Sequence, residues 1–257
     1  MTHIKKPGIF DVIRAFLFGS SWTRTIVCLA VSRKYSGYCV AGREITGGKE
    51  PRRVSTHVGD PGCGEWVRPV SRSEFAELTP DIMRLKSGGA PNLLDIVEVP
   101  LMRPVPCAYQ SENCLVDESR RWRITGAFPC EALSGICDER EILWLNGYSS
   151  AMGLNDRIPE KIAEEAMEAS LSLIRPESLT LTVENDLAGK RKVRAQFVYH
   201  KETYRLVVTD PVIEAHYMRK MNGRYPIRKR DIYICVSLSE PYEGYVYKLA
   251  ASIINAL

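Results

Sequence analysis

The side chains best suited to chemistry in this sequence are basic and aromatic, and many of the basic ones gather in two stretches. Residues 190–205 carry six Lys or Arg against one acid, Glu202, and residues 219–230 carry six against none. Basic groups bind phosphate oxygens, and aromatic rings offer faces on which bases stack. The two stretches therefore indicate a surface for DNA or RNA. The alternative is that they are solvated loops and strand edges, where Lys blocks edge pairing.

Candidate nucleic-acid-binding residues share a basic or aromatic side chain. The net charge of +4 is too small to imply nucleic acid by itself, so the prediction depends on where the charge lies. Tyr35 and Tyr242 are expected at loop tips, where base stacking and packing on a barrel are both open. Tyr38 and Tyr245 are expected to pack. The candidates are Arg33, Lys34, Tyr35, Arg43, Arg68, Lys190, Arg191, Lys192, Arg194, Arg224, Arg228, Lys229, Arg230 and Tyr242.

Patterns typical of enzymes and metal sites do not occur in the sequence. The four His have no metal-ligand spacing, no Gly-x-Ser-x-Gly elbow is present, and the eight Cys form no C-x-x-C pair. Asp210 precedes Pro211, a pair that favours capping a turn over catalysis. We therefore expect a protein without catalytic activity, metal or cofactor.

A motif that occurs twice organises the expected elements. Cys, Ser, Tyr, Gly and Tyr recur at the same offsets in residues 28–38 and 235–245, with apolar runs on both sides. Each copy is typical of a strand, a tight loop and a second strand, and the repetition predicts two related β units. In the second unit the motif comes last instead of first. Either that unit is circularly permuted, or the first and last strands meet in space and join the units, which we favour.

Short strands and few helices predict a mainly β protein with two small barrels of OB type packed together. We expect an amphipathic helix in residues 1–21, one barrel in 22–125, a connecting segment in 126–172 and a second barrel in 173–257. The first helix would dock on its own domain or on a partner protein.

Three local predictions complete the outline of the chain. A short helix pair is expected in residues 72–86, and Asp156 is expected to cap a helix that runs to about residue 170. Residues 46–64 are expected to form an exposed loop. The N-terminal stretch is too short and too charged to span a membrane, and eight Cys without a signal peptide indicate the cytoplasm.

Several segments together resemble the dual OB-containing domain family, uncharacterised bacterial proteins suggested to act in conflict or antiviral defence systems. The resemblance covers about residues 22–254 and implies OB folds and a role through nucleic acid, but no catalytic residue. The segments that carry it include Trp66-Val-Arg-Pro-Val-Ser71, Asn146-Gly-Tyr-Ser, Gly153-Leu-Asn-Asp-Arg157 and Val208-Thr-Asp-Pro-Val-Ile213.

Three functions fit the sequence. The first is a non-catalytic module that binds single-stranded or structured nucleic-acid ends without sequence preference, as an accessory factor in defence. The second is a scaffold subunit that holds a larger effector complex through its N-terminal helix and barrel faces. The third is a sensor that binds a nucleotide or another small ligand between the barrels.

Overall fold

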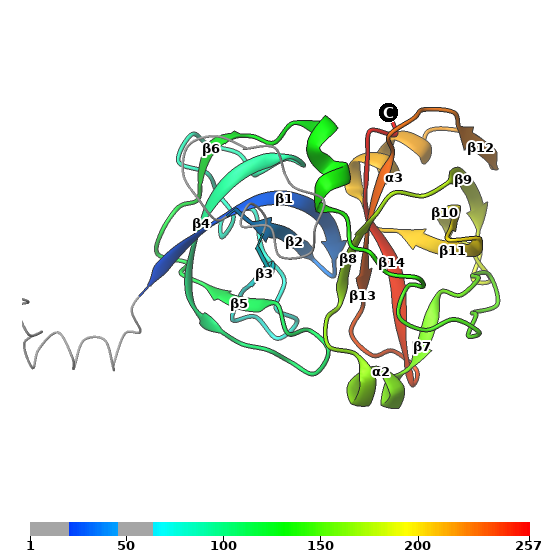
Figure 1. The fold of residues 1–257 in the computed structure, drawn as a ribbon, viewed down its shortest axis with the longest axis horizontal. Coiled ribbons are helices and arrows are strands. Elements are labelled where there is room, and N and C mark those ends of the chain that lie inside the picture. Colours follow the sequence, from blue (N-terminus) through cyan, green and yellow to red (C-terminus); the bar gives the residue numbers. More distant parts are fainter. Residues whose placement is uncertain (1–20, 46–63) are drawn as a thin grey trace, which may run out of the picture.

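The structure is a computed structural model that describes residues 21–45 and 64–257. Two β-sheets lie side by side, with short helices at their margins (Figure 1). The predicted N-terminal helix, apart from its last residue, and nearly all of the predicted 46–64 loop fall outside the described residues. The mainly β fold class is confirmed.

The first sheet closes into a five-stranded barrel. Its strands run in the order β1-β2-β3-β5-β4, and β4 also pairs with β1, while β6 adds to β4. Strands β3 and β5 are parallel, and the other neighbours are antiparallel. This is the five-stranded Greek-key barrel of an OB fold. The strands are β1 (Trp22–Lys34), β2 (Gly37–Glu44), β3 (Trp66–Val70), β4 (Asp95–Pro104), β5 (Asn113–Val116) and β6 (Arg123–Ala127).

The second sheet repeats this strand order. Its central path β9-β10-β11-β14-β13 matches β1-β2-β3-β5-β4, and β11 runs parallel to β14 as β3 does to β5. In the first barrel β1 pairs with β4. The corresponding strands of the second sheet are β9 and β13, and there β9 pairs with β12 and β13 pairs with β8. The strands are β7 (Arg157–Pro159), β8 (Leu171–Ile174), β9 (Ser178–Asn185), β10 (Arg191–Tyr199), β11 (Glu202–Val208), β12 (Gly223–Ile227), β13 (Tyr233–Leu238) and β14 (Tyr245–Ile254).

The repeated motif occupies hairpins that do not correspond in this topology. Its first copy spans β1 and β2, and its second spans β13 and β14, which match β4 and β5 of the first barrel. Both units therefore have the same strand order, without permutation. The first and last described strands meet instead, because Ser252 in β14 donates a hydrogen bond to the Leu29 carbonyl in β1.

Strand β1 is buried on both faces. Ile26 and Cys28 point into the first barrel, whereas Val27 and Leu29 pack on Cys235 and other residues of the second unit. Side chains alternate between the faces of a strand, so a strand buried on both sides must be apolar without interruption. This explains the run Ile-Val-Cys-Leu-Ala at residues 26–30, all of it buried. The joint between the units is thus a third hydrophobic core.

The helix pair predicted in residues 72–86 is wrong. The segment forms turns and bends, and Leu78 pairs its backbone with Tyr38 of β2 through two hydrogen bonds of 2.8 and 2.9 Å. Leu78, Met83 and Leu85 are buried in the first barrel's core. The segment cannot be helical at Leu78, because pairing with β2 requires an extended backbone. Its apolar residues therefore fill the barrel core from a loop.

The capping predictions have opposite outcomes. Asp210 caps α3 (Pro211–Tyr217) as predicted, and its carboxylate accepts from the Val212 and Ile213 amides at 2.9 and 3.1 Å. The prediction for Asp156 is wrong, because α2 (Glu160–Ala166) begins after Pro159 and ends four residues early. Asp156 is buried and instead accepts from the amide and hydroxyl of Ser150. A 3₁₀ helix, η1 (Cys130–Ile136), precedes this region.

Candidate nucleic-acid interface

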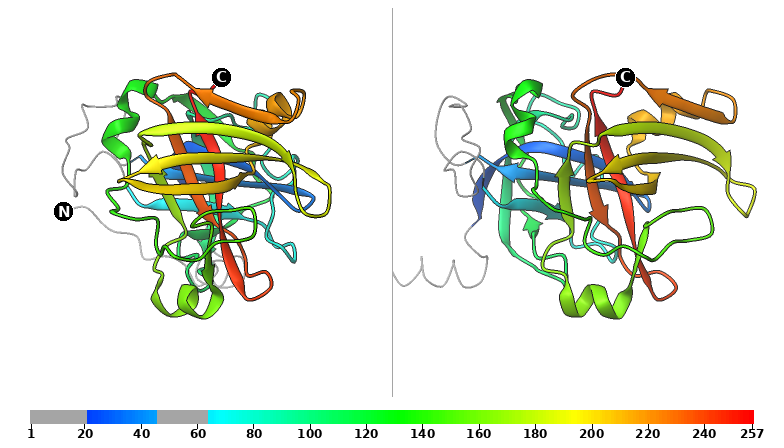
Figure 2. Two further views of the ribbon diagram at one scale, coloured as in Figure 1. Left: turned by 90° about the vertical axis from the view of Figure 1, so that its right-hand side faces the viewer. Right: turned by 45° about the vertical axis from the view of Figure 1, so that its right-hand side comes forward.

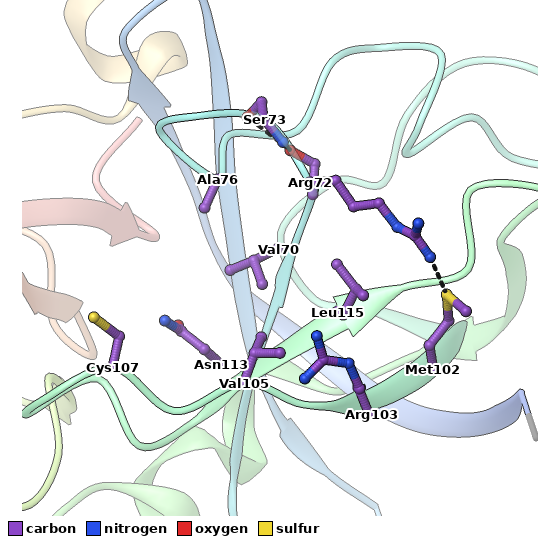
Figure 3. Close-up of a pocket in the computed structure, with 11 residues that line it drawn as sticks. Val70, Arg72, Ser73, Ala76, Met102, Arg103, Val105, Cys107, Asn113 and Leu115 are labelled. Carbon is purple, nitrogen blue, oxygen red and sulfur yellow. Dashed lines mark hydrogen bonds between the residues drawn. The ribbon is translucent and has the colours of Figure 1, made fainter. Parts of the chain in front are cut away.

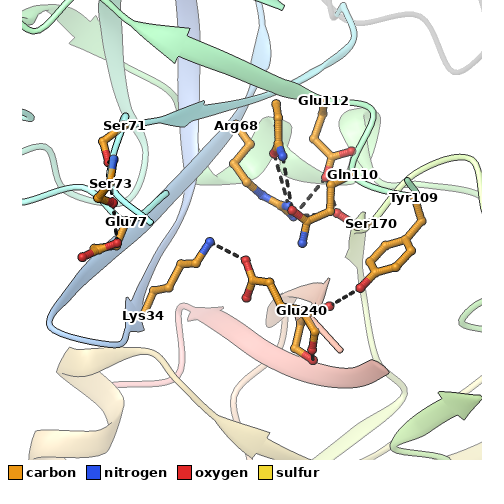
Figure 4. A network of polar contacts seen from close by, with 12 residues as sticks. Lys34, Arg68, Ser71, Ser73, Glu77, Tyr109, Gln110, Glu112, Ser170 and Glu240 are labelled. Carbon is orange, nitrogen blue, oxygen red and sulfur yellow. Dashed lines mark hydrogen bonds and ion pairs between the residues drawn. The ribbon is translucent and has the colours of Figure 1, made fainter. Parts of the chain in front are cut away.

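Three of the predicted basic residues are structural. Arg68 on β3 is buried where the two units meet, and its Nη2 lies 2.9 Å from Glu112 and 2.7 Å from Ser170 (Figure 4). Both partners are buried as well. A guanidinium held this way ties the first barrel to the start of β8 and does not face a ligand.

Arg43 on β2 has a similar role on another side of the joint. Its guanidinium pairs with Asp138 and lies over the Trp66 ring, 5.2 Å from the ring centroid. The same carboxylate accepts from the Leu173 amide of β8 at 2.8 Å. Arg43 therefore organises a bridge between the units.

Arg194 on β10 is also withdrawn from solvent. It is buried, its Nε lies 3.1 Å from Glu184, and Arg205 binds the same carboxylate at 2.5 Å. Burial lowers the pKa of Arg194, and the neighbouring charge of Arg205 lowers it further. One carboxylate shared by two guanidinium groups leaves a positive charge within this face of the sheet.

The turn between β1 and β2 carries the first predicted cluster. Arg33 Nε lies 2.7 Å from Glu214 in α3, and Lys34 Nζ lies 2.5 Å from Glu240 in the β13–β14 loop. Tyr35 is 65% exposed at the tip. The acids neutralise much of this cluster's charge, so its aromatic ring is the feature most open to a ligand.

Phe75 completes an exposed aromatic pair with Tyr35. The two rings stack with their centroids 4.2 Å apart, and Phe75 is also exposed. Sequence reasoning missed Phe75, because its segment was expected to be helical and no periodicity marks it. Exposed aromatic rings of this kind are the platforms on which single-stranded bases stack.

The second copy of the motif places Tyr242 on the surface. Tyr242 is 63% exposed in the β13–β14 loop. The two tyrosines that were expected to pack do so. Tyr38 packs on the first barrel's core, and Tyr245 is half-buried, with the Arg157 guanidinium 3.9 Å from the centroid of its ring.

The remaining predicted residues follow one margin of the second sheet, which we call the basic edge. Strand β12 is the last strand on this side and pairs with β9, with Arg224 opposite Thr182. The β9–β10 turn and the loop after β12 continue the same margin (Figure 2). All of its members are exposed except Lys192, which is half-buried. The basic edge consists of Lys190, Lys192, Arg224, Arg228, Lys229 and Arg230.

Arg191 lies within this margin but has a positioning role. Its guanidinium donates to the Met218 and Lys220 carbonyls at 3.1 and 2.6 Å and to the Asn222 side chain at 3.1 Å. These are the residues between α3 and β12. Arg191 therefore fixes the chain that leads into β12, and so orients Arg224.

A buried lysine that the sequence did not single out lies on β14. Lys248 Nζ donates to the Leu145 carbonyl at 2.5 Å and lies 5.3 Å from the centroid of the Tyr204 ring. Burial lowers its pKa to about 7, although Asp156 nearby acts in the opposite direction. Lys248 therefore gives the segment that contains Leu145 and Asn146 a titratable contact.

The described part of the chain offers neither a metal site nor a membrane-spanning helix. There, no group of three or more His, Cys, Asp or Glu is placed to hold a metal ion. Among the same residues, no helix has the length and apolar character needed to cross a bilayer.

Comparison with known proteins agrees with the strand order. A search of curated proteins finds no match. The family model described as a dual OB-containing domain matches residues 24–253, which spans both sheets. The chain therefore belongs to the family of dual OB-containing domains.

Proposed function

We propose that this protein is a non-catalytic module that binds single-stranded DNA or RNA, or structured ends, through the basic edge. The observation that carries the proposal is the gathering of exposed basic side chains along β12 and the β9–β10 turn. OB barrels bind oligonucleotides by combining positive grooves with aromatic platforms. The exposed Tyr35–Phe75 pair supplies such a platform on the other barrel.

The charge of the basic edge supports phosphate as the ligand group. In the described ranges, Arg224, Arg228 and Arg230 form no ion pair, in contrast to Arg33, Arg43 and Arg68. Contacts to backbone phosphates carry no sequence information, so binding through them is sequence-tolerant. We propose a role as an accessory factor of a bacterial defence system on the family resemblance alone, and a cytoplasmic location on the cysteine content of the sequence.

The test is fluorescence-anisotropy binding to short labelled single-stranded DNA, single-stranded RNA and duplex at several salt concentrations. Four phosphate contacts would give a slope of about −3 for log K against log salt on a single strand. The triple variant Arg224→Glu, Arg228→Glu, Arg230→Glu should lose binding and most of the slope.

The matched control is Lys161→Glu. Lys161 is 84% exposed on α2, at the opposite end of the second unit from β12 (Figure 1). This control should bind like the parent protein. No binding to any strand at low salt would refute the proposal, as would equal losses in the control and the triple variant.

A further inference from the structure

A pocket opens on the first barrel, away from the basic edge. Its volume is about 440 Å³, within the range of small-molecule sites. The end of β3 and the segment after it form one wall, and the end of β4 with the start of β5 forms the other (Figure 3). The pocket thus lies where the β3–β4 segment, which folds as a loop instead of a helix, meets the β4–β5 loop.

The walls of the pocket are partly apolar. Val70, Met102, Val105 and Leu115 line it (Figure 3), and Val70 on β3 is the sheet partner of Leu115 on β5. Val70 and Leu115 are buried and Met102 and Val105 are half-buried, so a flat ring in the pocket would remove the remaining apolar area from solvent. A bare inorganic ion would make no use of these walls.

Two guanidinium groups border the same space. Arg72 and Arg103 are both exposed lining residues, and Arg72 Nη2 lies 3.3 Å from the Met102 sulfur. A Glu118 oxygen accepts from the Arg72 backbone amide at 3.4 Å, but among the described residues neither guanidinium forms an ion pair. Guanidinium groups bind phosphate in bidentate geometry. The pocket therefore suits a ligand with both a flat ring and a phosphate.

The exposed aromatic pair adjoins this pocket. Phe75 lies in the chain between two lining residues, Ser73 and Ala76, and stacks on Tyr35 outside the pocket. A strand whose end occupied the pocket would have a stacking platform for its next base beside it. This neighbour favours a nucleotide over other ring-containing anions.

We propose that this pocket binds one nucleoside phosphate, with the base on its apolar walls and the phosphate between Arg72 and Arg103. The nucleotide is either free or the phosphorylated end of a strand. The choice of ligand class rests on the proposed function, but the site is separate from the basic edge.

Cys107 gives a direct readout, because this exposed free cysteine is one of the residues that line the pocket. The full chain is treated with a thiol reagent, and labelling at Cys107 is measured by peptide mapping with AMP, adenosine, inorganic phosphate or a 5′-phosphorylated oligonucleotide. Calorimetric titration with the same ligands runs in parallel. Half-buried Cys130 on η1 serves as the internal control, and its labelling should not change.

We expect AMP or the phosphorylated strand to slow labelling at Cys107 about tenfold at saturation, with adenosine and phosphate much weaker. Protection by AMP identifies a free nucleotide, and protection by the strand alone identifies a strand end. Arg103→Ala should abolish protection, whereas the triple variant of the basic edge should retain it.

The outcomes separate the two proposals. Equal protection by inorganic phosphate would overturn the nucleotide assignment. If no ligand gives a calorimetric signal or protects Cys107, the site itself is overturned. Binding of long strands that still depends on Arg224 would then leave the proposed function standing. Strand binding lost only in Arg103→Ala would refute the basic edge and keep the pocket.

Discussion

Lys34 and Glu240 form an ion pair of 2.5 Å between the two copies of the repeated motif. Lys34 follows Ser32 and Arg33 in the first copy, and Glu240 follows Ser239 in the second. The two tight loops therefore lie against each other. The two similar motifs therefore contact each other, but they do not occupy equivalent positions in the two units.

This pair should contribute measurably to stability. The Lys34 side chain is only 12% exposed, so its attraction to Glu240 is screened less than at an open surface. Lys34→Glu should lower the free energy of unfolding by about 1 kcal/mol or more in a urea titration. The exchange variant Lys34→Glu, Glu240→Lys should recover part of the loss. A single variant as stable as the parent would show that the contact is not stabilising.

The buried pair of Arg68 and Glu112 gives a larger effect. Arg68→Met leaves the Glu112 carboxylate buried without its cation, and removal of one partner from such a pair costs about 3–5 kcal/mol. Unfolding in guanidinium chloride measures the loss in free energy of unfolding. The double variant Arg68→Met, Glu112→Leu should be more stable than the single variant, because no charge is left alone. A double variant that is less stable than Arg68→Met would contradict this account.

Lys248 should make stability depend on pH. Its pKa is about 7 in the folded protein, against an ordinary value of 10.5. Between these values the unfolded chain holds a proton that the folded protein has released, so stability rises with pH from about 7 towards 10. Urea midpoints across this range should rise in the parent and rise less in Lys248→Met. Parallel pH profiles for the two proteins would exclude Lys248 as the source.

The aromatic pair predicts a defect specific to single strands. Tyr35→Ala removes the more exposed ring of the stack, and a stacked base contributes about 1–3 kcal/mol. Affinity for a short single strand should fall between about 5-fold and 150-fold, with little change in the salt slope, because no phosphate contact is lost. The control is Tyr148→Ala, an exposed tyrosine in another loop. Equal losses in both variants would argue against a stacking platform.

The sequence predicted what depends on local patterns. The two hairpins that carry the repeated motif, the cap at Asp210 and the packing of Tyr38 and Tyr245 all follow from apolar alternation and turn chemistry. The OB fold was predicted from the short strands and few helices, and the family resemblance implied it as well. Each of these features can be predicted from residues that are close in the sequence or from the pattern of a whole segment.

The sequence could not show which basic residues are already paired. Arg43 and Asp138 are 95 residues apart, and Arg68 meets Ser170 across 102 residues. Nothing local marks these partners, so the arginines were read as surface charge. The pocket was missed for the same reason: its walls come from three segments that meet only after the barrel has closed.

Strand β1 has a consequence for how the molecule unfolds. Because Val27 and Leu29 belong to a core shared with β8, β13 and β14, neither barrel can lose its structure without exposing apolar surface on the other. The two units are then expected to melt in one cooperative transition, as a single thermodynamic unit. The two OB folds that follow each other in the sequence therefore unfold as one cooperative domain.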